Sequence, residues 1–414
     1  MGVCQKGILK KADEGLFKLF DDKKRESPLL QRWVRRSLTN KHRKTTVINI
    51  KTYEFRLRPN KTQEKQLDVA LTLTRNLYNT GLEELISNYK ETGKHLNRFA
   101  HDKLHNVQTD PNIYSPLVDT TIARLHNSFA NFFRRLKTGE KPGFPRFKSF
   151  RQWHSLEFRD GLTNKLEGVY FNSGKKVAEK IRTVVHRPIE GIFKHARIIK
   201  RPSGWYVQFV CEVENNILPK TGKQVGIDVG IKYLIADSNG EFVENDKTYR
   251  KQLKKLRRSQ RVIFRRAKGS NRRLKAARNT ARLHERIVSR RKDYLHKVTT
   301  NIVNQNDTIV MEDLAIKNMV KNHRLALSIT DASWGIIKQM LSYKAENAGR
   351  NFVCVSPRFT SQKCSSCGEM VAKALSVRTH LCPYCGFTAD RDTNAAKNIL
   401  RLGRSLQEPN YATA

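Results

Sequence analysis

The sequence has few acidic residues for its size. Its 414 residues include 38 Asp and Glu against 80 Lys and Arg, which gives a formal net charge of +42. Repulsion on this scale opposes a compact fold unless a polyanion neutralises it, and nucleic acid is the polyanion that we expect. A membrane surface, or charge that serves only solubility, is the alternative.

The sequence also lacks long apolar runs. None approaches the roughly 18 residues that a membrane span needs, and the N-terminus has no apolar stretch of the kind found in signal peptides. These absences argue against an integral membrane protein and against secretion through a cleaved signal. We therefore expect an intracellular setting.

Cysteine is scarce, and four of the seven cysteines fall into two Cys-x-x-Cys pairs. Fourteen residues separate the pairs, and a glycine follows each of them. In a chain without a secretion signal, this spacing indicates a metal site rather than disulfides. Four thiolates form a closed, tetrahedral zinc site of the structural kind. The expected ligands of one structural Zn²⁺ are Cys364, Cys367, Cys382 and Cys385.

The first part of the sequence alternates between charged and amphipathic segments. Residues 1–45 are basic and weakly periodic, which predicts an extension that is partly disordered until nucleic acid binds. The alternative is that these residues are a fortuitous upstream extension of the reading frame. A short strand is expected at 53–59, and apolar residues at helical spacing predict long helices over 62–90 and 116–137. Between 139 and 150, a loop interleaves phenylalanines with cations, and it can either stack bases or pack a ring into the core. Its candidate nucleic-acid contacts are Phe144, Arg146, Phe147 and Lys148.

The remaining strands predict a mixed fold. β-rich runs between 167 and 213 are typical of a small barrel or sandwich. Two strands joined by a tight turn follow at 225–238. Buried strands at 308–314 and 351–357 flank a helix at 333–349, and this alternation predicts a sheet with parallel members. The expected fold class is α/β together with α+β, in several domains.

Residues 247–297 contain 21 Lys and Arg and only 2 acidic residues. Apolar residues recur there at helical spacing on both sides of a Gly-Ser-Asn break at 269–271, which predicts two long helices. A solvated helix face normally mixes charges of both signs, so we expect these cationic faces to lie against a polyanion. The candidate contacts on the second helix are Arg286, Arg290, Arg291 and Lys297.

Three acidic residues stand out by their surroundings. Asp228 interrupts an apolar strand between Gly226 and Gly230, where a carboxylate is costly to bury unless a metal or hydrogen bonds hold it. The two glycines would also let a phosphate backbone approach. Glu312 ends an apolar strand, at the edge where open α/β sheets bind ligands. Asp392 begins a helix of small and apolar residues that a later glycine, at position 403, is expected to end.

Each of these acids has a plainer interpretation. Asp228 could lie in a surface turn, Glu312 could be solvated at a strand end, and Asp392 could be an N-cap that accepts backbone hydrogen bonds. Together, however, carboxylates from two strands and a helix form the oxygen ligand set that Mg²⁺ prefers. Two such ions can hydrolyse a phosphodiester. The sequence has no HExxH motif and no Walker-type glycine loop, either of which would favour another chemistry.

Eight segments stand in a recognisable order along the chain. They are YEFRLRPNKTQ, KPGFPRFKS, GIDVGIKYL, HERIVSRRKDYLHKVTTNIV, IVMEDL, LALSITDASWG, SQKCSSCG…CPYCG and DRDTNAAKNIL. Together they resemble the TnpB family of transposon-encoded, RNA-guided DNA endonucleases, regarded as ancestral to the type V CRISPR effectors. The resemblance covers about residues 52–403. It implies a RuvC nuclease of RNase H-like fold in which Asp228, Glu312 and Asp392 are catalytic and hold two Mg²⁺ ions.

The resemblance also implies an order of domains. These are a basic extension (1–45), a wedge β-barrel (46–60 and 139–222), a helical recognition domain (61–138), a RuvC nuclease domain (223–356 and 389–404), a zinc-ribbon insert that binds target nucleic acid (357–388) and a C-terminal tail (405–414). The N-terminal extension and the last ten residues lie outside the resemblance, and the extension is not part of the pattern of the family.

Members of this family bind a noncoding RNA from the transposon end, recognise a short adjacent DNA motif and cut both DNA strands. The resemblance therefore implies a guide RNA and double-stranded DNA as partners, a monomeric ribonucleoprotein, and a prokaryotic cytoplasmic location at the nucleoid. The alternatives are an RNA-guided repressor that does not cleave, an unguided RNase H-like nuclease and a transposase. The presence of all three acids argues against the repressor.

Overall fold

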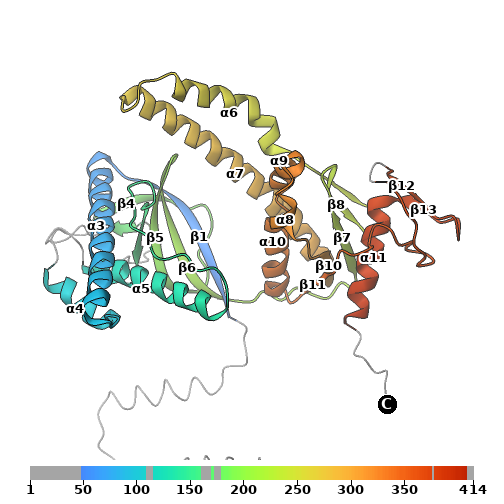
Figure 1. Ribbon diagram of the computed structural model, residues 1–414, viewed down its shortest axis with the longest axis horizontal. Coiled ribbons are helices and arrows are strands. Elements are labelled where there is room, and N and C mark those ends of the chain that lie inside the picture. Colours follow the sequence, from blue (N-terminus) through green and yellow to red (C-terminus); the bar gives the residue numbers. More distant parts are fainter. Residues whose placement is uncertain (1–47, 109–114, 160–168, 172–178, 375–376, 408–414) are drawn as a thin grey trace, which may run out of the picture. The chain divides into compact units, whose positions relative to one another are not determined.

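The computed structural model describes residues 48–108, 115–159, 169–171, 179–374 and 377–407 (Figure 1). All of these except Ile48 belong to one compact unit, Asn49–Ala414. Within the described ranges, no helix is both long and apolar enough to cross a lipid bilayer. The basic extension predicted over 1–45 lies outside the described residues.

Three helices follow the first strand: α3 (Lys61–Thr92), α4 (Arg98–Gln108) and α5 (Ser115–Lys137). Helix α3 begins with a capping box, in which the side chain of Asn60 accepts a hydrogen bond from the backbone of Gln63 and the side chain of Gln63 accepts one from the backbone of Asn60. It ends at Gly93, whose φ of 66° is the left-handed conformation that glycine adopts readily. The helices predicted over 62–90 and 116–137 are confirmed, whereas α4 is not among the predicted elements.

One sheet has six strands, in the order β2-β5-β6-β1-β4-β3. They are β1 (Ile48–Arg58), β2 (Ser155–Phe158), β3 (Val169–Phe171), β4 (Glu179–Val184), β5 (Ile192–Arg201) and β6 (Gly204–Glu214). The predicted strand at 53–59 therefore belongs to the same sheet as the later β-rich runs. Apolar side chains of this sheet, such as Phe55, share one core with Leu82 of α3 and Leu125 of α5. The barrel stays a prediction, because residues beside β3 lie outside the described ranges.

A second sheet has five strands, in the order β11-β10-β7-β8-β9. They are β7 (Gln224–Val229), β8 (Tyr233–Asp237), β9 (Phe242–Glu244), β10 (Thr308–Glu312) and β11 (Asn351–Val355). Strands β7, β8 and β9 pair in antiparallel fashion, whereas β10 runs parallel to both β7 and β11. The predicted sheet with parallel members is thus confirmed. Parallel neighbours need a crossover connection, and helices provide it here.

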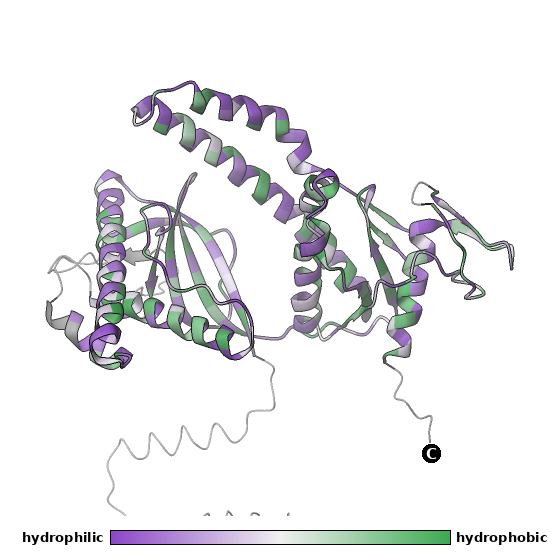
Figure 2. Ribbon diagram, in the orientation of Figure 1, coloured by the Kyte–Doolittle hydropathy of each residue, from purple (hydrophilic) through white to green (hydrophobic). Residues whose placement is uncertain are grey.

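Six helices accompany this sheet: α6 (Thr248–Phe264), α7 (Asn271–Gln305), α8 (Ile316–Met319), α9 (His323–Ala332), α10 (Trp334–Asn347) and α11 (Arg391–Ser405). Helices α6 and α7 confirm the pair predicted around the break at 269–271, and Figure 2 shows both to be largely hydrophilic. Apolar residues of α7 and α10, such as Leu295 and Leu341, share a core with the sheet. Helix α11 contacts β7, β8, β10 and β11.

Helix α11 lies very close to the sheet because two glycines remove side chains from the contact. A Cβ atom at Gly226 of β7 would lie 2.1 Å from a carbonyl oxygen of α11, and one at Gly403 would lie 2.4 Å from Val310 of β10. Two predictions are therefore wrong. Gly226 makes room for α11 and not for a phosphate backbone, and Gly403 packs within α11 and does not end it. Gly230 likewise faces protein, with the carbonyl oxygen of Tyr233 2.9 Å from its Cβ position.

Candidate active site

Asp228 and Glu312 lie on neighbouring parallel strands. In the register of β7 and β10, Ile227 stands opposite Met311, so the next residues along each strand, Asp228 and Glu312, are also neighbours. Because side chains alternate between the two faces of a sheet, residues in register on adjacent parallel strands point to the same face. Glu312 is the last residue of β10 and Asp228 the last but one of β7. The sheet therefore brings two of the predicted acids together at its carboxyl edge.

Asp392 reaches the same region from the first turn of α11. The N-cap of this helix is Asp390, whose carboxylate accepts hydrogen bonds from the backbone N–H groups of Asp392 at 2.8 Å and Thr393 at 3.4 Å. The interpretation of Asp392 as the N-cap is therefore wrong, because its neighbour fills that role. The carboxylate of Asp392 lies 3.7 Å from the guanidinium of Arg378 instead. Its side chain is only 17% exposed.

Burial and neighbouring carboxylates destabilise the charged form of Asp228. Burial raises the pKa of Asp228 well above its usual range, and the charges of Glu312 and Asp392 raise it further. The Asp228 residue is nevertheless partly exposed. Burial raises the pKa of Glu312, and the hydrogen bond from Thr360 lowers it by a smaller amount. Burial also raises the pKa of Asp392. Carboxylates held in this way favour either a proton or a cation.

The donor set suits a hard cation. Asp228, Glu312 and Asp392 offer only carboxylate oxygens, which are the ligands that Mg²⁺ prefers. Among the described residues, their oxygens are not one of the groups in which all ligand atoms lie within 4.8 Å of one another. These three residues would hold the metal, so the donor set fits the predicted Mg²⁺ site.

Two buried asparagines of α11 hold the chain segment that leads into the first cysteine pair. Asn398 donates hydrogen bonds to the backbone carbonyls of Thr360 at 2.9 Å and Lys363 at 2.7 Å. Asn394 donates to the same carbonyl of Lys363 at 2.8 Å and accepts from the backbone N–H of Ser365 at 2.9 Å. The hydroxyl of Thr360 in turn donates to the carboxylate at the end of β10, at 2.5 Å. Sequence reasoning missed this network, although the i, i+4 spacing of the two asparagines was visible.

The four predicted zinc ligands form one cluster. The Sγ atoms of Cys364 and Cys385 are 3.8 Å apart, those of Cys367 and Cys382 are 3.6 Å apart, and none is in a disulfide. A tetrahedral Zn²⁺ with Zn–S bonds of about 2.3 Å places its sulfurs about 3.8 Å apart. A glycine with positive φ follows each pair and closes its turn. The donors fit Zn²⁺, in an insert that also contains β12 (Thr379–Leu381) and β13 (Thr388–Asp390).

Family models match three parts of the chain. Residues 208–323 match OrfB_IS605, described as a "Probable transposase", residues 334–399 match the Cas12f1-like TNB domain, and residues 49–94 match a helix-turn-helix domain. A Streptomyces pristinaespiralis protein named "Putative RNA-guided DNA endonuclease" is 33% identical over 85% of this chain and 89% of its own length. The TnpB-like protein L770 of Acanthamoeba polyphaga mimivirus is 25% identical over 89% of this chain and 76% of its own. The chain belongs to the TnpB family.

A solved structure supports the fold of this TnpB-family chain. The Cas12f1–sgRNA–target DNA complex contains a chain that superposes with a TM-score of 0.53 at 17% identity, covering 81% of this chain and 82% of that one. The likeness concerns the fold alone. The region matched as a helix-turn-helix domain, 49–94, is here a strand followed by the single long helix α3.

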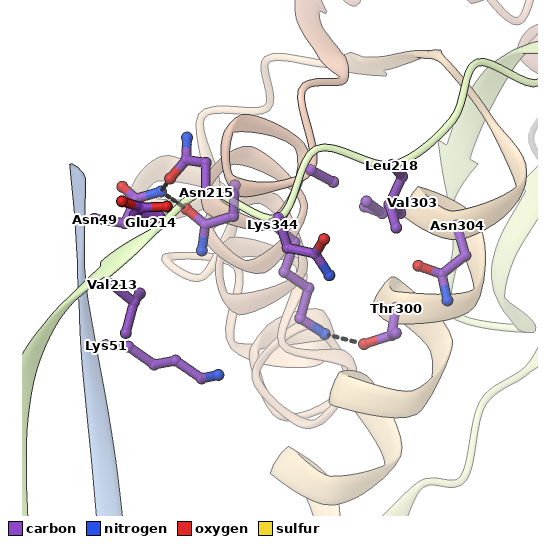
Figure 3. A pocket seen from close by; sticks show the side chains of 13 residues that line it. Asn49, Lys51, Val213, Glu214, Asn215, Leu218, Thr300, Val303, Asn304 and Lys344 are labelled. Carbon is purple, nitrogen blue, oxygen red and sulfur yellow. Dashed lines mark hydrogen bonds between the residues drawn. The ribbon is translucent and has the colours of Figure 1, made fainter. Parts of the chain in front are cut away.

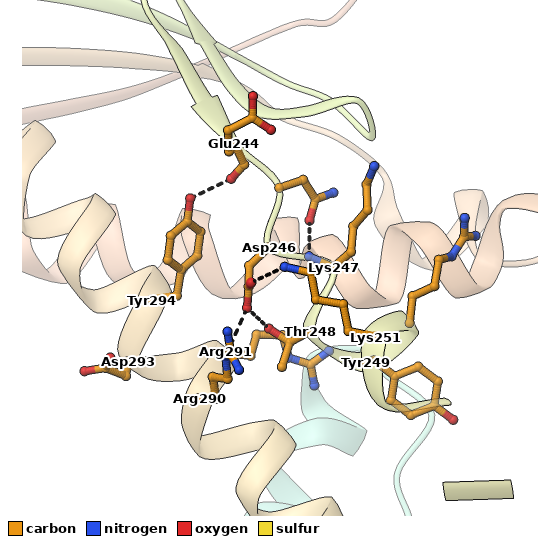
Figure 4. A network of polar contacts seen from close by, with 12 residues as sticks. Glu244, Asp246, Lys247, Thr248, Tyr249, Lys251, Arg290, Arg291, Asp293 and Tyr294 are labelled. Atoms are coloured by element: carbon orange, nitrogen blue, oxygen red, sulfur yellow. Dashed lines mark hydrogen bonds and ion pairs between the residues drawn. The ribbon is translucent and has the colours of Figure 1, made fainter. Parts of the chain in front are cut away.

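In this TnpB-family protein, two of the four predicted contacts on α7 lie beside acids of the protein itself, and Figure 4 shows the contact of Arg290 with Asp246. The Nε atom of Arg290 lies 3.5 Å from Asp246, which also accepts a hydrogen bond from Lys251 at 2.8 Å. A guanidinium nitrogen of Arg291 lies 3.7 Å from Asp331, and the Arg291 side chain is only 18% exposed. The Asp331 carboxylate also caps the start of α6 by accepting two backbone hydrogen bonds. Both arginines therefore stabilise the junction of α6, α7 and α9.

The other two predicted contacts on α7, Arg286 and Lys297, are exposed. Lys297 pairs with Asp293 at 2.8 Å, but an exposed pair of this kind contributes little and leaves the cation accessible. Arg286 lines a hollow together with Arg282. Arg290 is also 63% exposed despite its contact with Asp246, so Arg286, Arg290 and Lys297 can all meet a phosphate, and this role stays a prediction.

The loop at 139–150 is pinned at one end and exposed along the rest. The side chain of Asn79 accepts a hydrogen bond from the backbone N–H of Lys148 at 2.7 Å and donates to its carbonyl at 3.1 Å. Phe144 makes edge-to-face contacts with two phenylalanines of α5, at 5.5 and 5.6 Å between centroids. Phe147 is 55% exposed, and Arg146 is exposed too. Phe144 therefore packs on α5 although its ring is 51% exposed, whereas base stacking by Phe147 stays a prediction.

A separate pocket contains none of the three acids (Figure 3). Asn49, Lys51 and Lys344 are among its lining residues. Burial lowers the pKa of Lys344 to about 8. Its ammonium group nevertheless donates to a backbone carbonyl of α7 and to the hydroxyls of Thr299 and Thr300, at 2.7 to 2.8 Å. All three ammonium protons have acceptors on α7, so this lysine ties α10 to α7.

The structure also assembles a polar cluster that the sequence analysis does not single out. Glu84 of α3 contacts His101 and His105 of α4, which are 0% and 6% exposed. His126 of α5 hydrogen-bonds to His101 at 3.0 Å. Burial lowers the pKa of His101, and it lowers that of His126 to about 4, so both rings are neutral at pH 7. The signal was the His-x-x-x-His spacing, which places both rings on one face of a helix.

Proposed function

We propose that this TnpB-family protein is an RNA-guided DNA endonuclease with a RuvC-type active site at Asp228, Glu312 and Asp392. The convergence of the three carboxylates carries the proposal, because their mutual repulsion has no structural benefit unless cations bind there. The sheet supports it too, since an antiparallel meander extended by two parallel strands is the topology of RNase H-like nucleases.

Two Mg²⁺ ions held by these acids would activate a water and stabilise the departing oxygen of a DNA phosphodiester. The chain's own contribution is positioning. Strands β7 and β10 set two carboxylates side by side, and the close contact of α11 with Gly226 sets the third. Asp390 supports this arrangement by capping α11, because its carboxylate, and not that of Asp392, accepts the backbone hydrogen bonds of the first turn.

The proposed partners are a guide RNA from the transposon end and double-stranded DNA. The names of the relatives support them, as does the +42 charge, which suits a chain that holds two nucleic acids in one monomeric ribonucleoprotein. The insert that contains the cysteine cluster, residues 357–388 by the resemblance, would contact target nucleic acid. A Streptomyces relative supports a prokaryotic source, and a cytoplasmic location at the nucleoid is part of the proposal.

The first experiment purifies the protein with its bound RNA and sequences that RNA. One discrete species derived from the transposon end is expected, and a random population of cellular RNA would overturn the guided function. The second experiment adds target DNA and Mg²⁺ and compares the wild type with Asp228→Ala. The variant should bind guide and target normally but leave both strands intact. Cleavage by Asp228→Ala would show that the acids are wrongly assigned, whatever the RNA result.

A further inference from the structure

We infer that Glu84, His101 and His105 form a second zinc site, independent of the cysteine cluster and of the proposed nuclease activity. The three donor atoms converge on one point. The Nε2 atoms of His101 and His105 lie 3.0 and 2.7 Å from the same carboxylate oxygen, Oε2 of Glu84, and 3.2 Å from each other. Among the described residues, only this group and the four cysteines place three or more such ligand atoms within 4.8 Å.

The distances suit a small ion at the centre. With bonds of about 2.0–2.2 Å, neighbouring donors of a tetrahedral zinc site lie about 3.3–3.5 Å apart. The present separations of 2.7 to 3.2 Å are shorter, by up to about 0.8 Å, as expected where protons rather than an ion lie between the donors. Two imidazoles and one carboxylate are a ligand set that Zn²⁺ takes up in proteins, with a fourth position for water. The Glu84 side chain, 31% exposed, leaves a path for that water.

The surroundings orient one of the ligands. When Nε2 of His101 binds a metal, its proton resides on Nδ1, and Nδ1 lies 3.0 Å from Nε2 of His126. A second residue that fixes the tautomer of a ligating histidine is a recurrent feature of zinc sites. Gly81 gives the ring its place, since a Cβ atom there would lie 3.1 Å from Cε1 of His101.

The cluster also explains how α4 is attached. Of the α4 side chains that the structure describes, the buried ones are His101 and His105, and Phe99 is 81% exposed. Burying two imidazoles is unfavourable unless their polar atoms are satisfied, so hydrogen bonds to Glu84 or a shared ion must compensate. A zinc ion would join α3 to α4 far more firmly than two hydrogen bonds to one oxygen. The ion would therefore join the two helices, although its fourth position, open to water, sets it apart from the closed cysteine cluster.

Metal content tests the inference directly. The RNA complex of the full chain is prepared with zinc present, dialysed, and analysed by mass spectrometry of the elements. We expect about two zinc ions per chain, one for each cluster. Glu84→Gln and His105→Ala should each reduce the content to about one, and so should Cys382→Ser. His95→Ala, which changes an exposed histidine beside the cluster, is the matched control and should retain both ions.

Cobalt substitution keeps the test decisive if a variant folds poorly. Co²⁺ in the cysteine cluster gives a thiolate-to-metal charge-transfer band, whereas Co²⁺ bound by nitrogen and oxygen gives only weaker ligand-field bands. His105→Ala should lose the latter and retain the former, which also reports that the rest of the chain is folded. One zinc per wild-type chain, or zinc content unaffected by His105→Ala, would mean that the cluster is a hydrogen-bonded network only.

Discussion

Thr360 donates its hydroxyl proton to Oε1 of Glu312 at 2.5 Å, and the two residues are 48 positions apart in the sequence. Thr360 is 4% exposed and Glu312 is 7% exposed. The threonine lies just before the first cysteine pair, so the loop that leads into the zinc cluster also fixes the orientation of a proposed metal ligand. The second carboxylate oxygen of Glu312 remains available for the cation.

Replacing Thr360 by valine keeps the shape of the side chain and removes the hydroxyl. Without this hydrogen bond the Glu312 carboxylate is free to rotate, and partners of metal ligands typically contribute 10- to 100-fold to affinity or activity. We expect about that loss in the single-turnover rate of DNA cleavage, with target binding unchanged. Thr360→Ser, which retains the hydroxyl, should cleave at nearly the wild-type rate. A fully active Thr360→Val would show that the hydroxyl does not matter.

Changing Asn394 to alanine should loosen the zinc insert. The change leaves the N–H of Ser365 without its acceptor and removes one of the two amide donors to Lys363, in a buried region where an unsatisfied group costs about 1–3 kcal/mol. The free energy of unfolding should fall by that amount, and zinc should pass faster to a chromogenic chelator. Ser405→Ala, on the exposed end of the same helix, is the control and should alter neither quantity.

Gly226→Ala tests how closely α11 must approach β7. The new methyl group would meet a backbone carbonyl at 2.1 Å and a backbone nitrogen at 2.7 Å, so the whole helix has to shift and carry Asp392 with it. We expect a loss of several kcal/mol in unfolding free energy, of the order of overpacking penalties, and loss of cleavage. Gly335→Ala in α10 is the opposite case, because its nearest neighbour would be 3.5 Å away. Replacing a helical glycine by alanine typically raises the free energy of unfolding by about 0.5–1 kcal/mol, so Gly335→Ala should not be destabilised. Equal stability changes for the two variants would contradict the packing argument.

The sequence was most informative where function depends on local spacing. The cysteine pairs, and the turn that separates β7 from β8, lie within short segments, and both were predicted correctly. The N-cap of α11 was harder to identify. Whether it is Asp390 or Asp392 depends on the residue at which α11 begins, and helix ends are the least predictable part of a helix. The glycines were misassigned for another reason. What a missing side chain makes room for depends on the segment that packs there, and sequence patterns do not identify that segment.

The same limit explains the histidines. His101 and His105 are four residues apart and easily seen as a pair, but their third partner, Glu84, lies on another helix. Only the packing of α3 against α4 places its carboxylate between the two rings. Likewise, Arg290 and Arg286 are equivalent in the sequence as cations of one basic helix. The contact with Asp246, which comes from outside the helix, distinguishes them.

The pH dependence of stability should reveal the repulsion among the three acids. The folded-state pKa of Asp228 is raised above its unfolded value of about 3.9, so folding binds its proton and the favourable contribution is present at low pH. That contribution is lost as the pH rises through the folded-state pKa. In buffer without Mg²⁺ at pH 7, Asp228→Asn should therefore have a higher free energy of unfolding than the wild type. Urea unfolding at several pH values measures the difference, which should shrink towards pH 4 or when Mg²⁺ is added.

Asp237→Asn provides the matched control on the neighbouring strand. Its carboxylate accepts hydrogen bonds from the backbone N–H groups of Asn239 at 2.9 Å and Glu241 at 2.8 Å, so neutralising it should weaken the β8–β9 turn. We expect a lower unfolding free energy for this variant at pH 7. If Asp228→Asn also proved less stable than the wild type there, Asp228 would be held by favourable contacts and the interpretation as a metal ligand would lose its electrostatic basis.

Two phenylalanines of the 139–150 loop should respond differently to the same change. Phe147 is 55% exposed, and stacking of a base on such a ring is worth about 1–3 kcal/mol, which corresponds to roughly 5- to 150-fold in affinity. Phe147→Ala should weaken guide-RNA or target-DNA binding within that range, measured by fluorescence anisotropy at fixed salt, and leave thermal unfolding unchanged. Phe144 is 51% exposed but packs edge-to-face on Phe129 and Phe132, so Phe144→Ala should lower the unfolding temperature and affect binding less. Unchanged affinity for both nucleic acids in Phe147→Ala would remove this loop from the nucleic-acid interface and leave it with a packing role alone.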